Sequence, residues 1–116
     1  MAGVVYEKSY LFAVRVVNMY KFLCREHSEF VLSKQLLRSG TAIGALIREA
    51  KYAQSRADFI NKNSIALKEA NETDYWIDLL HDTGYLNQKM HEDIKKDINE
   101  LISLLVSIVK STKNNS

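Results

Sequence analysis

Residues 38–50 read RSGTAIGALIREA, and this stretch places two glycines, Gly40 and Gly44, four positions apart. Six of the seven residues that follow Arg38 are small. Each glycine in a helix interior costs about 1 kcal/mol relative to alanine, so both need a reason in the packing. We expect the small residues to form a smooth helix face that a neighbouring helix approaches closely, with bulky side chains such as Tyr75 and Trp76 against it.

Hydrophobic residues on both sides of this stretch recur every three or four positions, which predicts helices. The chain has no proline and only four glycines in 116 residues, so little interrupts them. The predicted helices span residues 6–26, 29–53, 56–82 and 88–111. Short loops between long helices imply antiparallel neighbours. We therefore predict an all-α, up-down-up-down four-helix bundle that forms one domain over residues 1–116.

Polar residues between the predicted helices indicate where the helices begin and end. Ser28 is a candidate cap for the second helix and Asn87 for the fourth. Ser55, followed three residues later by Asp58, forms a capping-box pattern for the third. Gly84 predicts a left-handed residue after the third helix.

The first and fourth predicted helices are apolar over more than one face. A bundle helix needs only one buried stripe, yet residues such as Leu11 and Val106 fall outside it. Two interpretations remain open. Either the buried stripe is wide, or the outer sides of these helices contact other subunits.

Composition indicates a cytoplasmic protein. Cys24 is the single cysteine, which excludes an intramolecular disulfide framework and a multi-cysteine zinc site. The N-terminal sequence MAGVVYEKSY does not resemble a signal peptide, and the apolar runs are shorter than the ~18 residues of a membrane span. We expect no membrane partner.

Charge is distributed unevenly along the chain. The net charge is +2, but residues 34–68 carry +5 and residues 69–100 carry −6. This asymmetry fits a basic surface for an anionic partner, head-to-tail contacts between subunits, or solvated faces that pair within the chain. The candidate nucleic-acid-binding residues are all basic and lie in one segment, with Tyr52 and Phe59 among them: Lys34, Arg38, Arg48, Lys51, Arg56, Lys62 and Lys68.

The second and third predicted helices also suggest one specific contact. If they are antiparallel around a turn near residue 55, the numbers of facing residues add to about 110. This register places Arg38 near Glu72 and predicts an ion pair between the helices. The alternative is two independent surface side chains, which contribute little to stability.

No pattern of catalytic or metal-binding residues is present. Asp78 and His81 form a single D-x-x-H motif, whereas a di-iron bundle needs two E-x-x-H motifs and two more carboxylates. No arginine precedes a histidine by five to seven residues, the spacing of one class of four-helix ribonucleases. Gly40 and Gly44 are too close for a phosphate-binding loop. We predict no enzymatic activity, metal, cofactor or small-molecule substrate.

Three blocks of sequence between residues 35 and 80 closely resemble a known signature: QLLRSGTAIGALIREA, AQSRADFI and IALKEANETDYWIDLL. They are similar to the four-helix bundle family of 23S rRNA intervening-sequence proteins, whose members are encoded in insertions in bacterial ribosomal RNA genes or stand alone. The resemblance implies a homo-oligomeric ring, typically a pentamer, without known catalytic residues. It also implies that the packing signature includes Gly40, Gly44 and Trp76.

A related bundle is the accessory variability determinant of diversity-generating retroelements. The resemblance implies that such a bundle engages nucleic acid and a reverse transcriptase through a basic ring surface. The net charge of +2 departs from strongly basic relatives. Two functions follow as hypotheses. One is a non-enzymatic, self-assembling accessory protein that binds RNA, DNA or a ribonucleoprotein, and the other is a protein-interaction scaffold that binds no nucleic acid.

Overall fold

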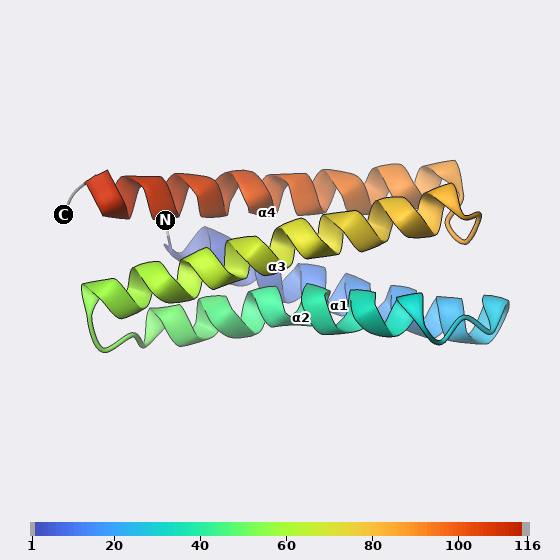
Figure 1. Ribbon diagram of the computed structural model, residues 1–116, viewed down its shortest axis with the longest axis horizontal. Coiled ribbons are helices and arrows are strands. Elements are labelled where there is room, and N and C mark those ends of the chain that lie inside the picture. The colour runs from blue at the N-terminus through green and yellow to red at the C-terminus, as the bar shows by residue number, and fades with distance from the viewer. Residues whose placement is uncertain (1, 115–116) are drawn as a thin grey trace.

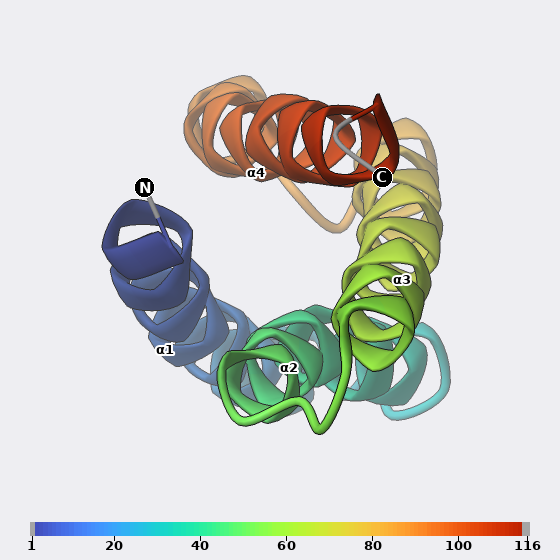
Figure 2. The same cartoon turned by 90° about the vertical axis from the view of Figure 1, so that its left-hand side faces the viewer.

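Four long helices make up the protein in the computed structural model, which describes residues 2–114. They are α1 (Ala2–His27), α2 (Leu32–Lys51), α3 (Arg56–Asp82) and α4 (Gln88–Asn114). Successive helices run in opposite directions along a bundle 47 Å long (Figure 1). Seen from one end, they lie in chain order around a common centre (Figure 2). The predicted all-α, up-down-up-down bundle is confirmed. Residues 1, 115 and 116 of the predicted domain lie outside the described residues.

The helix bounds match the prediction for α3 and for the start of α4. α1 begins at Ala2 rather than residue 6, and α4 continues to Asn114 rather than 111. The earlier start of α1 has a packing reason, because Val5 is buried in the core with 2% of its surface exposed. α2 is shorter than predicted at both ends.

The start of α2 differs from the prediction because Glu29, and not Ser28, caps it. Ser28 has a φ of 50°, which is the left-handed region rather than the extended conformation of an N-cap. The Glu29 carboxylate accepts hydrogen bonds from the backbone N–H groups of Val31, Leu32 and Ser33 at 3.2, 3.1 and 2.7 Å. Burial alone would raise the pKa of Glu29, but these donors lower it below its ordinary value.

The other residues predicted to cap or end a helix, Ser55, Asn87 and Gly84, are confirmed. Ser55 accepts a hydrogen bond from the Asp58 backbone N–H at 3.0 Å, and Asn87 accepts one from Met90 N–H at 2.9 Å. Gly84 has a φ of 89°. Only the return half of the capping box differs, because the Asp58 carboxylate accepts from Gln54 N–H at 3.3 Å.

The core combines large apolar side chains with several buried polar ones. The largest fully buried apolar residues are Phe12, Val16, Leu23, Leu36, Ile43, Ile77, Leu80, Ile94, Ile98, Leu101 and Leu105. Thr73 donates a hydrogen bond to Ser39 at 2.9 Å, which links α3 to α2 inside the core. Asn63 is also buried, with 2% of its surface exposed.

The two glycines of α2 face α1. A Cβ on Gly40 would lie 2.8 and 2.9 Å from the two γ-carbons of Val16. A Cβ on Gly44 would lie 3.3 Å from the backbone oxygen of Ser9. Close approach is therefore present, but the prediction that Tyr75 and Trp76 of α3 lie against this face is wrong.

α1 also carries an exposed apolar face. Val4, Tyr10, Leu11 and Val14 are each between 42% and 57% exposed. In α4, Val106 is exposed, while Ile102 and Leu104 pack against the core. The extra apolar residues thus lie mainly on the outside of α1 and mainly on the inside of α4. No helix within residues 2–114 has an apolar run long enough to cross a membrane.

Candidate nucleic-acid interface

The seven basic residues predicted to contact nucleic acid lie along α2, the following loop and the first half of α3, and they do not form one compact patch. Lys34 and Lys51 stand near opposite ends of α2. Seventeen positions on one helix separate them by about 26 Å. Each residue must therefore be judged by its own surroundings.

Arg38 lies against Glu72, as the antiparallel register predicts. A second carboxylate, that of Glu69, is 3.7 Å from the guanidinium. Trp76 Nε1 donates a hydrogen bond to the same Glu72 carboxylate at 3.1 Å. Arg38, Glu72 and Trp76 thus form one polar cluster between α2 and α3. Two carboxylates offset the charge of Arg38, which makes it a poor phosphate contact.

Lys62 and Arg56 are also engaged within the protein. Lys62 Nζ is 3.0 Å from the Glu49 carboxylate. The hydrogen bond from Lys62 to Glu49, with the attraction between their charges, raises the pKa of Lys62 above its ordinary value. Arg56 Nη2 donates to the backbone oxygen of Thr112 at 2.9 Å, so it ties the start of α3 to the end of α4.

Arg48 and Lys51 gather at one aromatic ring of α1. The Arg48 guanidinium carbon is 5.2 Å from the centre of the Tyr6 ring, and Lys51 Nζ is 4.6 Å from it. Lys51 is also 5.7 Å from the centre of the Tyr52 ring, which is 73% exposed. These four residues form the Tyr6 cluster. It combines two cations with two aromatic rings, and the ring of Tyr52 is open to solvent. A cation placed over the face of an aromatic ring is attracted to it.

A hollow between α1 and α2 adjoins the Tyr6 cluster. Its volume is roughly 390 Å³. Tyr10 and Ala13 line it from α1, and Gly44 and Ala45 line it from α2, together with Arg48 and Glu49. The small residues of the glycine stretch thus leave room beside the cluster. Lys34 and Lys68 are exposed elsewhere and have no ion-pair partner among the described residues.

In the D-x-x-H motif of α3, Asp78 forms ion pairs with α4, whereas His81 lies 3.2 Å from Asp82 of the same helix. Lys95 Nζ lies 2.7 Å from both Asp74 and Asp78, and His91 Nε2 lies 2.9 Å from Asp78. Burial alone would raise the pKa of Asp78, but its hydrogen bonds with Lys95 and His91 lower it. Within residues 2–114, no group of three or more His, Cys, Asp or Glu residues could hold a metal ion.

Comparison with known proteins gives the family. The family model of the 23S rRNA-intervening sequence proteins matches residues 3–107. The chain belongs to this family. A solved relative is a Bacteroides thetaiotaomicron protein of unknown function from the S23 ribosomal protein family. It is 61% identical, with a TM-score of 0.92, and the match covers 94% of this chain and 97% of that one. No relative is found among the curated proteins.

The part of the chain that matches the 23S rRNA-intervening sequence family contains the whole Tyr6 cluster and both packing glycines. The family is one of unknown function, and the Bacteroides relative adds no activity. Family membership therefore supports the fold, and any function has to be argued from the surface of this protein.

Tyr6 and Asn63 are the two important residues that the sequence analysis did not identify. The sequence contains a pattern that predicts the position of each of them. The same antiparallel register that pairs Arg38 with Glu72 would place Tyr6 beside Lys51 if applied around the turn near residue 28. Asn63 lies four positions after Phe59 and three before the buried Ala66, on the inner stripe of α3.

Proposed function

We propose that this member of the 23S rRNA-intervening sequence family is a non-enzymatic, self-assembling accessory protein that binds nucleic acid through the Tyr6 cluster. The observation that carries the proposal is the convergence of Arg48 and Lys51 on one tyrosine ring, beside the exposed ring of Tyr52. Lysine and arginine neutralise phosphates, and aromatic rings stack on unpaired bases. The family name refers to intervening sequences of 23S rRNA, which favours RNA as the ligand.

Self-assembly would strengthen such a small site. Two cations on one chain support only weak, salt-sensitive binding. Several copies in one assembly repeat the site and raise the affinity for a long strand without any new contact. The proposal therefore includes a homo-oligomer, with five copies as the family resemblance implies.

The exposed face of α1 supports contact between copies. Val4, Leu11 and Val14 are spaced by seven and three positions, which places them on one side of the helix, and Tyr10 adjoins them. An apolar face of this kind is characteristic of protein–protein contacts. We expect light scattering after size-exclusion chromatography to give the mass of five chains. Leu11→Glu should reduce that mass, whereas Tyr75→Ser, at an exposed ring on α3, should not. A wild-type mass of one chain would contradict self-assembly.

Nucleic-acid binding can be tested with matched pairs of charge-removing substitutions. Affinity for an unpaired RNA, a hairpin RNA and DNA of the same sequence would be measured across a salt series. The double variant R48Q/K51Q should bind RNA about tenfold more weakly and reduce the salt slope by about 2. The control K34Q/K68Q removes the same charge from exposed lysines outside the cluster and should change binding little. Tyr52→Leu should lower the affinity for the unpaired RNA more than the affinity for the hairpin RNA, because unpaired bases stack on the ring.

Two outcomes would reject this function. If the control pair weakens binding as much as R48Q/K51Q, then only total charge matters and the Tyr6 cluster is not the site. If the wild-type protein binds none of the three nucleic acids at low salt, the alternative of a protein-interaction scaffold is favoured.

A further inference from the structure

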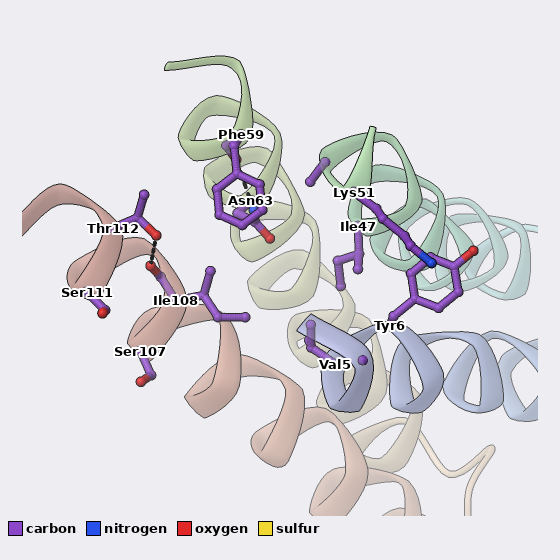
Figure 3. A pocket seen from close by; sticks show the side chains of 12 residues that line it. Val5, Tyr6, Ile47, Lys51, Phe59, Asn63, Ser107, Ile108, Ser111 and Thr112 are labelled. Carbon is purple, nitrogen blue, oxygen red and sulfur yellow. Dashed lines mark hydrogen bonds between the residues drawn. The ribbon is translucent and has the colours of Figure 1, made fainter. Parts of the chain in front are cut away.

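A cavity lies at the end of the bundle where α1 begins and α4 ends. All four helices line it, with Val5 from α1, Ile47 from α2, Asn63 from α3 and Ile108 from α4 (Figure 3). Its volume is roughly 390 Å³, which is within the range of about 300 to 1,000 Å³ of small-molecule pockets. The cavity exists because α1 and α4 make the smallest of the four helix–helix contacts. Small residues around it, such as Ala50, do not fill the space.

Asn63 gives this cavity a polar group on its inner wall. The side chain is 98% buried, since 2% of its surface is exposed. Its Nδ2 donates a hydrogen bond to the Phe59 backbone oxygen at 2.9 Å. Its Oδ1 has no hydrogen-bond partner among the described residues, and Figure 3 shows this oxygen directed toward the space between Ile47 and Ile108. This oxygen borders the cavity, so the wall presents an acceptor to a molecule that occupies the space.

The remaining walls define the other properties of a ligand. Val5, Ile47 and Ile108 offer aliphatic surface, and Phe59 offers an aromatic ring. Along α4, the hydroxyl side chains of Ser107, Ser111 and Thr112 also line the cavity. The charged group of the lining is Lys51, whose ammonium lies over the Tyr6 ring. An anion would meet the Asn63 carbonyl oxygen, which repels negative charge. A cation would lose its hydration against aliphatic walls without gaining a counter-charge.

We propose that this cavity is a small-molecule binding site for a neutral, mainly apolar ring compound with a single N–H or O–H donor. The donor bonds to Asn63 Oδ1, and the ring packs between Val5, Ile47 and Ile108. This inference does not rest on nucleic-acid binding, because Asn63 is the recognition group, although Tyr6 and Lys51 of the Tyr6 cluster also line the cavity. It departs from the sequence-based expectation that the protein takes no small molecule. That expectation rested on missing catalytic motifs, which an interior cavity does not require.

Two probes of the same shape can test the donor requirement. Indole and benzofuran are both fused two-ring compounds, and they differ in one atom, an N–H in indole and an oxygen acceptor in benzofuran. Binding to the whole protein would be measured by calorimetry and by the shift of the Asn63 side-chain amide signals in NMR spectra. We expect indole to bind about tenfold more tightly than benzofuran, which is the effect of roughly one neutral hydrogen bond. Because all four helices contact the ligand, indole should also raise the melting temperature.

Three variants separate the roles of Asn63. Asn63→Ala removes the acceptor and keeps the space, so both probes should bind with similar affinity. Asn63→Leu removes the acceptor and narrows the space, so indole should bind more weakly than it does to the parent and should lose its advantage over benzofuran. Asn61→Ala changes an exposed asparagine of the same helix and should bind both probes as the parent does. Circular dichroism would check the helical fold of each variant. If Asn63→Leu does not fold, the comparison of Asn63→Ala with the parent is sufficient to test the proposal.

Three results would overturn the proposal. Equal affinities of indole and benzofuran for the parent would show that Asn63 does not recognise the donor. Unchanged indole binding by Asn63→Ala or Asn63→Leu would place the probe elsewhere. No binding of either probe up to its solubility limit would show that the cavity holds water only.

Discussion

The middle of the bundle and its terminal end are packed in opposite ways, although α2 runs through both. In the middle, Gly40 lies so close to Val16 that a single added carbon would meet both γ-carbons within 2.9 Å. About two to three turns farther along α2, Ile47 and Ala50 border a cavity of roughly 390 Å³. This contrast between the two regions shows that small residues do not by themselves produce tight packing. They do so only where the facing helix supplies a side chain that fills the space.

Polar residues follow the same division. In the middle, Ser39 and Thr73 are buried, and the Thr73 hydroxyl donates a hydrogen bond to the Ser39 hydroxyl at 2.9 Å. At the cavity, Asn63 is equally buried, but its carbonyl oxygen has no donor among the described residues. At these two places, the closely packed hydroxyls bond to each other, whereas the carbonyl that borders the cavity accepts no bond from the described residues. Because this carbonyl borders an unfilled space, the cavity end is the natural place for a ligand or for stabilising substitutions.

The largest expected effect would come from filling the tight region. Gly40→Ala should destabilise the protein by about 1–3 kcal/mol, although alanine favours a helix by about 1 kcal/mol. Val16 is fully buried and β-branched, so it cannot easily move away. Gly40→Leu should cost more than Gly40→Ala. Urea unfolding measures both.

Gly3 provides the control for this prediction, because a Cβ there would meet nothing within 4 Å. Gly3→Ala should therefore leave the protein unchanged or slightly more stable. Gly44→Ala should fall between the two, since its Cβ would lie 3.3 Å from a backbone oxygen. If Gly40→Ala is as stable as the parent, the contrast between the middle and the end of the bundle is wrong.

A smaller effect of opposite sign is expected in the loose region. Asn63→Leu should stabilise the protein by about 1 kcal/mol, because it adds apolar area that the cavity walls bury. The loss of the bond from Asn63 to the Phe59 oxygen offsets part of this gain. Thermal unfolding measures the shift. Asn61→Leu, on the exposed side of α3, should stay within about 0.5 kcal/mol of the parent. A large destabilisation by Asn63→Leu would mean that the space cannot accept the side chain.

The smallest effect concerns the polar contact between α2 and α3. A double-mutant cycle with Arg38→Met and Glu72→Gln should give a coupling of about 0.5 kcal/mol, since Arg38 is 54% exposed. Glutamine at 72 keeps an acceptor for Trp76. A second cycle with Arg38→Met and Glu100→Gln should give no coupling, because Glu100 pairs with Lys8 instead. Additive losses in the first cycle would show that the Arg38–Glu72 contact does not stabilise the bundle.

Contacts between helices joined by a short loop were the most predictable part of the structure. The turn between α2 and α3 sets their register, so Arg38 could be assigned to Glu72 from numbering alone. The partners of Gly40 and Gly44 were assigned to α3 although they lie on α1. Small residues show that something approaches closely, but they do not show from which side. Asn63 was missed because a polar residue on a helix is usually exposed, although its spacing from Ala66 and Ala70 places it inward.

Elements that depend on neighbouring residues could be predicted from the amino-acid sequence alone. Periodic apolar positions specified four helices, Ser55 and Asn87 specified where two of them begin, and short loops made them antiparallel. The distance between α1 and α4 could not be predicted in this way, because no loop connects these helices and the fit of their side chains sets their separation. That separation opens the cavity at Asn63. Likewise, the packing of α1 on α2 brings Tyr6 to Arg48 and Lys51, a cluster that no local stretch of sequence contains.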